Sequence, residues 1–203
     1  AAKTVDYVVF FGGLNKAEYQ DSEGHDRKDF DLPYGQNSVV EALAEVNRNI
    51  VYVNISGNAA HLSFVKKVPA IIQGWFIGSQ AGEALASVLC GDANPSGKLP
   101  MTWNNRLTDY APHALGTYPG TWRDGKKEII DQEYSEGVYV GYRWNDLKKI
   151  KPVFAFGHGL SYTTFRLSDL RLSAKEITAD ETLTATVTLT NTGQRTGAEV
   201  VQL

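Results

Sequence analysis

Short apolar runs alternate with segments of helical periodicity in the first half of the chain. β-Branched and aromatic residues dominate the runs 5–11, 50–55 and 70–77, which predicts three buried strands. Ser38 and Glu41 have the spacing of a capping box and predict a helix start, and Ser79 precedes an apolar stripe that predicts a second helix ending near Gly91. A shorter helix is expected over 61–67, before Pro69. Because strands and helices alternate, the predicted class of residues 1–92 is α/β with a parallel sheet.

The periodicity is lost from about residue 94 to 152, where Pro, Gly, Tyr and Trp are dense. A structureless stretch of this length is unusual inside a compact domain. We therefore expect a loop that packs over the sheet and has function attached to it.

The last part of the chain has the pattern of a β-domain. Apolar residues alternate with threonines over 182–190, and Asn191-Thr-Gly193 has the composition of a turn. This pattern predicts a half-buried antiparallel strand that enters a hairpin. Because a β-sandwich needs about seven strands, only the truncated start of one is expected here.

Composition and charge narrow the classes of partner. With 42% hydrophobic and 11% aromatic residues, the chain has enough apolar material for a sizeable core. The net charge is -3 and the basic residues are scattered, so neither nucleic acid nor a membrane surface is an expected partner. Apolar stretches stay below the ~18 residues that a membrane span needs. The single cysteine, Cys90, ends an apolar helix pattern and is expected to be an inert core thiol.

The polar segment after the first predicted strand is the candidate for chemistry. Its six acidic residues are Glu18, Asp21, Glu23, Asp26, Asp29 and Asp31. Ligand sites of open α/β sheets lie beyond the carboxyl ends of the strands, where this segment must lie. Glu23 precedes Gly24, which lets the backbone turn, and Asp26 and Arg27 are expected to pair and fix the loop. On these residues alone, a solvated acidic surface remains the open alternative.

The sequence has no motif typical of a metal site, a nucleotide cofactor or a serine hydrolase. The four histidines, His25, His61, His113 and His158, lack the spacing of metal ligands, so no metal site is expected. A G-x-G-x-x-G fingerprint and a G-x-S-x-G elbow are both absent from the sequence. We therefore expect neither a nucleotide cofactor nor a serine hydrolase triad.

Three segments together resemble glycoside hydrolase family 3, and they occur in the family's order over nearly the whole chain. The first is Gly13-Leu-Asn15 with Ser22-Glu-Gly-His-Asp-Arg27 and Leu32-Pro33; the second is 74–92 with Asn94-Pro-Ser-Gly-Lys-Leu-Pro100; the third is Tyr139-Val-Gly-Tyr-Arg143 with Phe156-Gly-His-Gly-Leu-Ser-Tyr-Thr163. The second is the most specific. The resemblance implies a partial α/β sandwich with a mostly parallel sheet over 1–162, namely the family's C-terminal domain without its N-terminal part. It also implies that 163–203 is the truncated start of an all-β fibronectin-type-III-like sandwich.

The resemblance also implies an activity, that of a retaining, exo-acting β-D-glucosidase. Glu23 matches the family's general acid/base, with Asp21 and Glu18 as possible substitutes, and Asp21, Asp26 and Arg27 are assigned to support of the loop. The nucleophile would come from a (β/α) barrel domain that normally precedes this segment, so this chain alone is expected to be inactive. The other implied partner is a β-linked oligosaccharide or glycoside. No cofactor is expected, and the enzyme is expected to be periplasmic or secreted.

Two other functions remain open. A β-xylosidase of the same family is one, because the barrel largely determines which sugar is bound. A non-catalytic carbohydrate-binding module is the other, since several aromatic side chains have the chemistry to stack on sugar rings. These are Tyr118, Trp122, Tyr139, Tyr142 and Trp144.

Overall fold

The computed structural model describes residues 1–123, 125 and 129–202. Residues 124 and 126–128, in the predicted long loop, and residue 203, at the end of the predicted β-domain, lie outside the described residues. The chain forms two compact units. The first contains Ala1–Ala81 and Pro100–Gly157, and the second contains Gly82–Leu99 and His158–Leu203. The predicted division into domains 1–162 and 163–203 stays a prediction.

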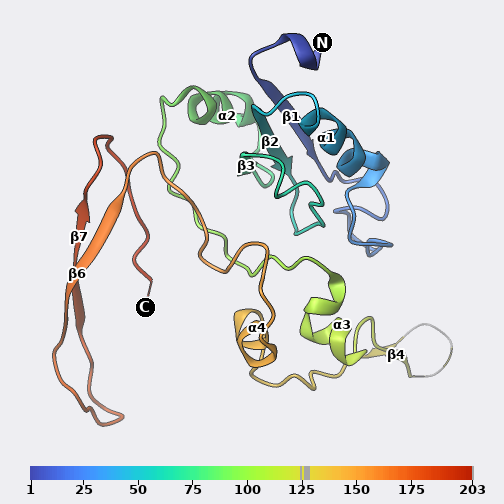
Figure 1. Ribbon diagram of the computed structural model, residues 1–203. Coiled ribbons are helices and arrows are strands. Elements are labelled where there is room, and N and C mark those ends of the chain that lie inside the picture. The colour runs from blue at the N-terminus through green and yellow to red at the C-terminus, as the bar shows by residue number, and fades with distance from the viewer. Residues whose placement is uncertain (124, 126–128, 203) are drawn as a thin grey trace. The chain divides into compact units, whose positions relative to one another are not determined.

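A parallel three-stranded sheet is the centre of the first unit (Figure 1). Its strands are β1 (Val8–Gly13), β2 (Ile50–Ile55) and β3 (Ala70–Gln73), in the order β1-β2-β3. Val8 of β1 lies opposite Ile50 of β2, and Val51 lies opposite Ala70 of β3. The predicted α/β class and parallel sheet are therefore confirmed. β1 begins and ends later than the predicted run 5–11, and β3 is shorter than the predicted run 70–77.

The core of this unit lies around β2, the central strand. Tyr52 and Val53 of β2 and Phe64 of the following connection are fully buried, and the Tyr52 and Phe64 rings meet edge to face with centroids 4.7 Å apart. Burial raises the pKa of the Tyr52 phenol far above its usual value. Its hydroxyl therefore remains a donor, and it donates to Oδ1 of the buried Asn54 at 3.0 Å.

The first helix, α1 (Gln36–Ala44), starts earlier than the capping-box pattern predicted. A 3-10 turn, η2 (Pro33–Gly35), leads into it, and its N-cap is Gly35 in the left-handed conformation. The Glu41 carboxylate does not return to the helix start; it accepts a hydrogen bond from the Ser63 hydroxyl. The predicted capping box is therefore wrong, because a tertiary partner takes Glu41.

The expected helix over 61–67 is also wrong. His61 forms a bridge to Asp31, and residues 63–67 are turns. The physical reason is the spacing of the buried residues. Leu62, Phe64 and Val68 are all buried, and a helix would place Leu62 and Phe64 on different faces.

The long stretch 94–152 contains short elements, and it is not structureless. They are η3 (Leu107–Asp109), α3 (Ala111–Leu115), β4 (Thr121–Trp122), β5 (Ile130–Asp131) and α4 (Tyr142–Lys148). Trp103 anchors the part of this stretch that belongs to the first unit. Its ring is buried, and its indole N–H donates to the Ala60 carbonyl at 2.8 Å. The segment therefore packs on the connection that follows β2.

The second unit contains α2 (Ala81–Cys90) apart from its first residue. It also contains a hairpin of β6 (Phe165–Leu172) and β7 (Ala185–Asn191). Gly91 follows α2 with φ +83°, as its predicted stop requires. Cys90 is exposed, so the expectation of a core thiol is wrong; it is the last residue of the helix. The hairpin partner of β7 precedes it in the chain and does not follow the turn at Asn191, which corrects the predicted pairing. The fibronectin-type-III-like assignment stays a prediction.

The remaining short element is the 3-10 turn η1 (Ala2–Thr4). Among the described residues, every helix is too short or too polar to cross a lipid bilayer.

Candidate active site

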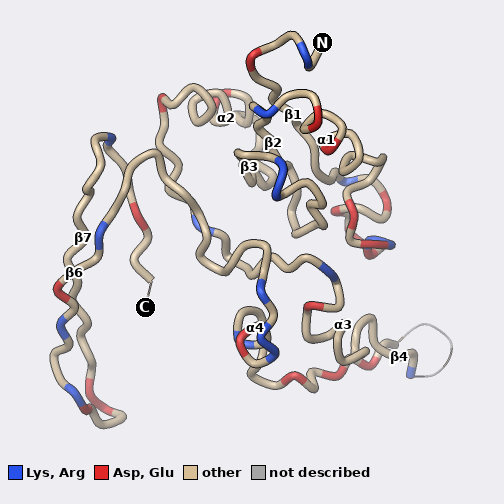
Figure 2. The backbone as a smooth tube through the Cα atoms, in the orientation of Figure 1, with Lys and Arg blue, Asp and Glu red and all other residues tan. Residues whose placement is uncertain are grey.

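The acidic loop lies where the sequence predicts it, between the carboxyl end of β1 and η2. Figure 2 shows its acidic residues gathered in this stretch of the first unit. The loop contains no helix or strand, apart from a bridge at Asp31. Side-chain hydrogen bonds therefore add to the few backbone bonds of the loop, and they differ from one carboxylate to the next.

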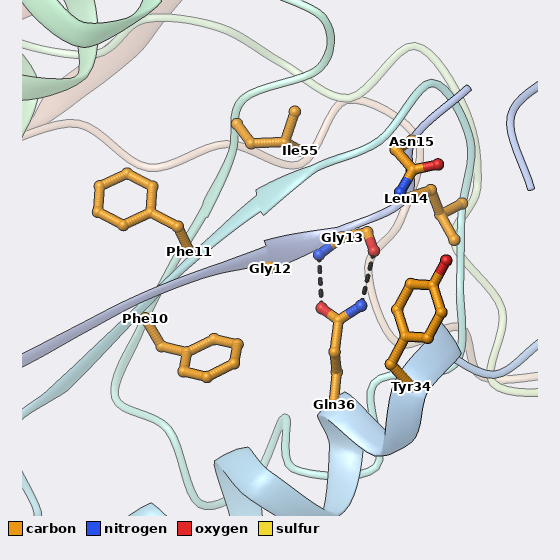
Figure 3. Close-up of a pocket in the computed structure, with 9 residues that line it drawn as sticks. All are labelled: Phe10, Phe11, Gly12, Gly13, Leu14, Asn15, Tyr34, Gln36 and Ile55. Carbon is orange, nitrogen blue, oxygen red and sulfur yellow. Dashed lines mark hydrogen bonds between the residues drawn. The ribbon is translucent and has the colours of Figure 1, made fainter. Parts of the chain in front are cut away.

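At the foot of the loop, Gln36 binds the backbone of Gly13. The Gln36 amide accepts the Gly13 N–H at 2.8 Å and donates to the Gly13 carbonyl at 2.8 Å (Figure 3). This pair of bonds joins the first residue of α1 to the last residue of β1. The N–H and the carbonyl of the last residue of β1 therefore both have a hydrogen-bond partner at the point where the loop begins.

A cavity of about 390 Å³ opens beside this contact. Figure 3 shows Phe10 and Phe11 on opposite sides of β1, and Tyr34 rising from η2 towards Asn15. The wall of the cavity is largely apolar. It is formed by Phe10, Phe11, Gly12, Gly13, Leu14, Asn15, Tyr34, Gln36 and Ile55. The cavity adjoins the loop at its first residues, and it does not include Glu23.

The first turn of the loop is built around Asn15 and Gln20. The Asn15 N–H donates to Gln20 Oε1 at 3.0 Å, and the Asn15 side chain accepts from the Ala17 N–H at 2.7 Å. Gln20 in turn donates to the Tyr34 hydroxyl at 2.8 Å. These bonds fix the direction in which the chain reaches Asp21.

Asp21 is held by the connection that follows β2. Its Oδ2 accepts the Gly57 N–H at 2.6 Å, and its own N–H donates to the Asn15 carbonyl at 2.9 Å. A Cβ on Gly57 would lie 2.9 Å from the Phe76 ring and 3.4 Å from Asp21 Oδ2, so glycine permits this close approach. Asp21 therefore serves as a structural acceptor.

Glu18 is engaged within the loop itself. It lies 3.8 Å from His25 Nε2, and its hydrogen bond and negative charge raise the pKa of the neighbouring Tyr19 phenol. Tyr19 and His25 also meet edge to face, with ring centroids 5.0 Å apart. Glu18 thus has local partners that a reacting carboxyl group would have to leave.

Glu23 differs from both. It is exposed, it precedes Gly24 with φ +85°, and among the described residues its carboxylate has neither a hydrogen bond nor an ion pair. A carboxyl group at the tip of an otherwise bonded loop is available to an incoming ligand. Of the three carboxylates considered from the sequence, Glu23 is the one without an assigned contact.

Asp26 and Arg27 do not form the expected pair, and that prediction is wrong. Arg27 turns inward: its Nη2 donates to the Ala59 carbonyl at 2.6 Å, and its guanidinium lies over the Phe30 ring at 5.5 Å. Burial lowers the pKa of Arg27, and the nearby carboxylates of Asp21 and Asp29 oppose that shift. The guanidinium therefore stays charged under the loop.

Asp26 bonds to a distant tyrosine. The Tyr118 hydroxyl donates to the Asp26 carboxylate, and this bond raises the pKa of Tyr118 to about 12, with smaller contributions from burial and the Asp26 charge. Sequence reasoning missed this role of Tyr118 and the role of Gln36. The residues of the Tyr118 pair are 92 positions apart, and no local pattern signals such a contact.

The aromatic residues proposed for sugar stacking divide into two groups. Trp144 is 5% exposed, so little of its ring is open to solvent, whereas Tyr118, Trp122, Tyr139 and Tyr142 are exposed. Trp144 lines a second cavity, of about 410 Å³, together with Thr102 and the buried Glu136. Each of these three side chains has a buried polar atom without a hydrogen-bond partner among the described residues. The same described part of the chain holds no group of three or more His, Cys, Asp or Glu able to bind a metal ion.

Comparison with known proteins assigns the chain to an enzyme family. Residues 1–142 match the glycosyl hydrolase family 3 C-terminal domain, and the chain belongs to that family. Beta-glucosidase BoGH3A of Bacteroides ovatus is 47% identical over 204 residues, which cover 100% of this chain and 26% of the relative. Thermostable beta-glucosidase B of Acetivibrio thermocellus is 41% identical, with coverage of 100% and 25%.

A solved structure shows the same fold. DesR, a beta-glucosidase from Streptomyces venezuelae crystallised in complex with D-glucose, superposes with a TM-score of 0.83 at 35% identity, over 96% of this chain and 23% of that chain. The chain thus spans about a quarter of the length of the relatives that it matches.

Proposed function

We propose that the polypeptide carrying this chain is a retaining, exo-acting β-D-glucosidase and that Glu23 is its general acid/base. Membership of family 3 and relatives named as β-glucosidases support the activity. The observation that carries the assignment of Glu23 is the contrast within the loop. Asp21 is bonded to Gly57, Glu18 lies 3.8 Å from His25 Nε2, and Glu23 is exposed with neither a hydrogen bond nor an ion pair among the described residues.

In this mechanism, Glu23 acts twice. It first protonates the departing glycosidic oxygen while a second carboxylate attacks the anomeric carbon and forms a glycosyl-enzyme. It then takes a proton from the water that releases the sugar. The two carboxyl groups of a retaining glycosidase lie about 5–5.5 Å apart, so the nucleophile is expected at that distance from the Glu23 carboxyl group.

Several finer statements belong to the same proposal. The nucleophile is an aspartate of a preceding (β/α) barrel, the substrate is a β-linked oligosaccharide or glycoside, and the 203-residue chain alone does not turn it over. Export to the periplasm or the medium is also proposed, and cell fractionation would test it. Activity of the purified chain by itself would remove the need for a barrel nucleophile.

The test compares the full polypeptide with its Glu23→Gln variant on two aryl β-glucosides, one with a good and one with a poor leaving group. The poor leaving group needs protonation, so its kcat/KM should fall by orders of magnitude, and that of the good leaving group should fall far less. Added azide, which needs no general base, should restore turnover and give a β-glycosyl azide. Equal effects on both substrates would assign Glu23 a structural role and redirect attention to Asp21 and Glu18.

The same experiment separates the alternatives. Preference for aryl β-xylosides over β-glucosides would indicate the xylosidase. A full polypeptide without hydrolytic activity, whose isolated chain still binds sugars, would indicate a binding module that uses exposed aromatic residues such as Trp122 and Tyr139.

A further inference from the structure

We propose that Asp21 and Arg27 are positioning residues that clamp the loop on either side of Glu23 to the connection after β2. The proposal rests on the assignment of Glu23 as the acid/base. Asp21 precedes Glu23 by two residues and Arg27 follows it by four. Asp21 bonds to the Gly57 N–H and Arg27 bonds to the Ala59 carbonyl, each at 2.6 Å. The two attachment points are thus two residues apart on one short segment.

That segment is itself firmly held. The buried Ser56 hydroxyl donates to the Asn58 carbonyl at 2.8 Å, and Gln73 of β3 donates to the Ser56 carbonyl at 3.0 Å. Ala59 and Ala60 are buried, and the Trp103 indole donates to the Ala60 carbonyl at 2.8 Å. The clamp therefore fastens an exposed loop to a connection that is itself bonded to β3 and to Trp103.

The two anchors act on opposite backbone groups. Asp21 is an acceptor and Arg27 a donor, so one contact cannot replace the other. Their opposite charges also attract each other beneath the loop. Between the anchors, Glu23 and Gly24 are exposed. Apart from the chain neighbours of Gly24, no described atom lies within 4 Å of the position that a Cβ on Gly24 would take. The Tyr118 hydroxyl also holds Asp26, and Asp21 and Arg27 add restraints on either side of Glu23 that tie the loop to the connection after β2.

This restraint is what general acid catalysis needs. The proton donor must lie within about 2.6–3.2 Å of the leaving oxygen. A misplacement of about 1 Å can lower the rate on the order of 10²-fold. Loosening the loop should therefore reproduce, in weaker form, the leaving-group dependence caused by removal of the Glu23 carboxyl group.

The test uses Asp21→Ala and Arg27→Ala in the full polypeptide, on the same pair of aryl β-glucosides. We expect kcat/KM for the poor leaving group to fall roughly 10- to 100-fold, and that for the good leaving group to fall much less. Asp21→Asn keeps an oxygen that can accept the Gly57 N–H, so it should restore most of the rate. Lys16→Ala is the matched control, because Lys16 is exposed in the same loop and has neither a hydrogen bond nor an ion pair among the described residues.

The outcomes separate the clamp from the proposed function. If Glu23→Gln lacks leaving-group dependence, the acid/base assignment fails. If Glu23→Gln behaves as expected but the alanine variants affect both substrates equally or not at all, the clamp alone is overturned. Should the alanine variants not fold, Asp21→Asn and Arg27→Lys decide. For Arg27→Lys, kcat/KM should fall only with the poor leaving group. For Asp21→Asn, kcat/KM should stay close to the wild-type value. An equal loss with both substrates in both variants would contradict the clamp.

Discussion

Gln36 and Gly13 are joined by two hydrogen bonds, one in each direction between a side-chain amide and a backbone peptide, both at 2.8 Å. The contact crosses from the start of α1 to the end of β1. Replacement by leucine should leave the Gly13 N–H and carbonyl unpaired and lower the free energy of unfolding by about 2 kcal/mol. Denaturant titration followed by tryptophan fluorescence measures this, with Gln80→Leu, at an exposed site, as the control expected to change little. An unchanged midpoint for Gln36→Leu would mean that solvent replaces both bonds.

Gly13 itself cannot carry a side chain. Its φ is +126°, and an added Cβ would lie 2.0 Å from the Ile55 carbonyl oxygen on β2. Gly13→Ala should therefore destabilise the chain by roughly 3 kcal/mol or more, because backbone strain and a steric clash with β2 act together. Gly82→Ala is the matched comparison: it lies in α2 with open space around it and should stabilise by about 0.5–1 kcal/mol. Thermal unfolding should show a lower midpoint for Gly13→Ala and a higher midpoint for Gly82→Ala than for the wild type. Equal shifts in the two variants would contradict this expectation.

Glu136 is a buried carboxylate whose Oε2 has no hydrogen-bond partner among the described residues. Glu136→Gln replaces this buried acidic group by a neutral amide, whose burial costs less, and should raise the unfolding free energy of the 203-residue chain by about 1 kcal/mol. Glu133→Gln, at an exposed site nearby, should have little effect. A loss of stability in Glu136→Gln, measured by denaturant titration, would instead show that this site accommodates the carboxylate better than the amide.

Tyr118 should make stability depend on alkaline pH. Its pKa is raised to about 12 by donation to Asp26, so the folded state binds this proton more tightly than the unfolded state, in which the phenol has its ordinary pKa of 10.0. The stabilising contribution is complete below pH ~10 and is lost as the pH rises towards 12. Tyr118→Phe should be less stable than the wild type at pH 8, and the difference should disappear near pH 12. A constant difference in thermal midpoint across this range would show that Tyr118 does not titrate through the contact.

The sheet was the part of the fold that the sequence revealed best. The run Ile50-Val-Tyr-Val-Asn-Ile55 corresponds to β2 at both ends, because a central parallel strand is buried on both faces and its signal is a continuous apolar run. The partner of β7 was missed for the opposite reason. β6 has an irregularity between Ser168 and Arg171, with Asp169 at φ +56°, and this breaks the alternation that marks a half-buried strand.

The candidate site was predicted only in part. The position of the acidic loop follows from sheet topology, and Glu23 was selected by the family resemblance. The contacts that distinguish the carboxylates were not predictable: Arg27 was expected beside Asp26, yet it bonds to Ala59, 32 residues away. Such contacts depend on the three-dimensional approach of a loop and a strand connection. Neither composition nor periodicity carries information about that approach.

The sheet order β1-β2-β3 also has a consequence for the solution behaviour of the isolated chain. Among the described residues, β1 and β3 each pair with β2 alone, so both outer edges present unpaired backbone groups. Phe11 and Val9 of β1 are exposed as well. Open edges with apolar side chains are templates for aggregation. The 203-residue chain produced alone should therefore self-associate as its concentration rises, and a longer polypeptide that covers these edges should remain monodisperse in sedimentation experiments.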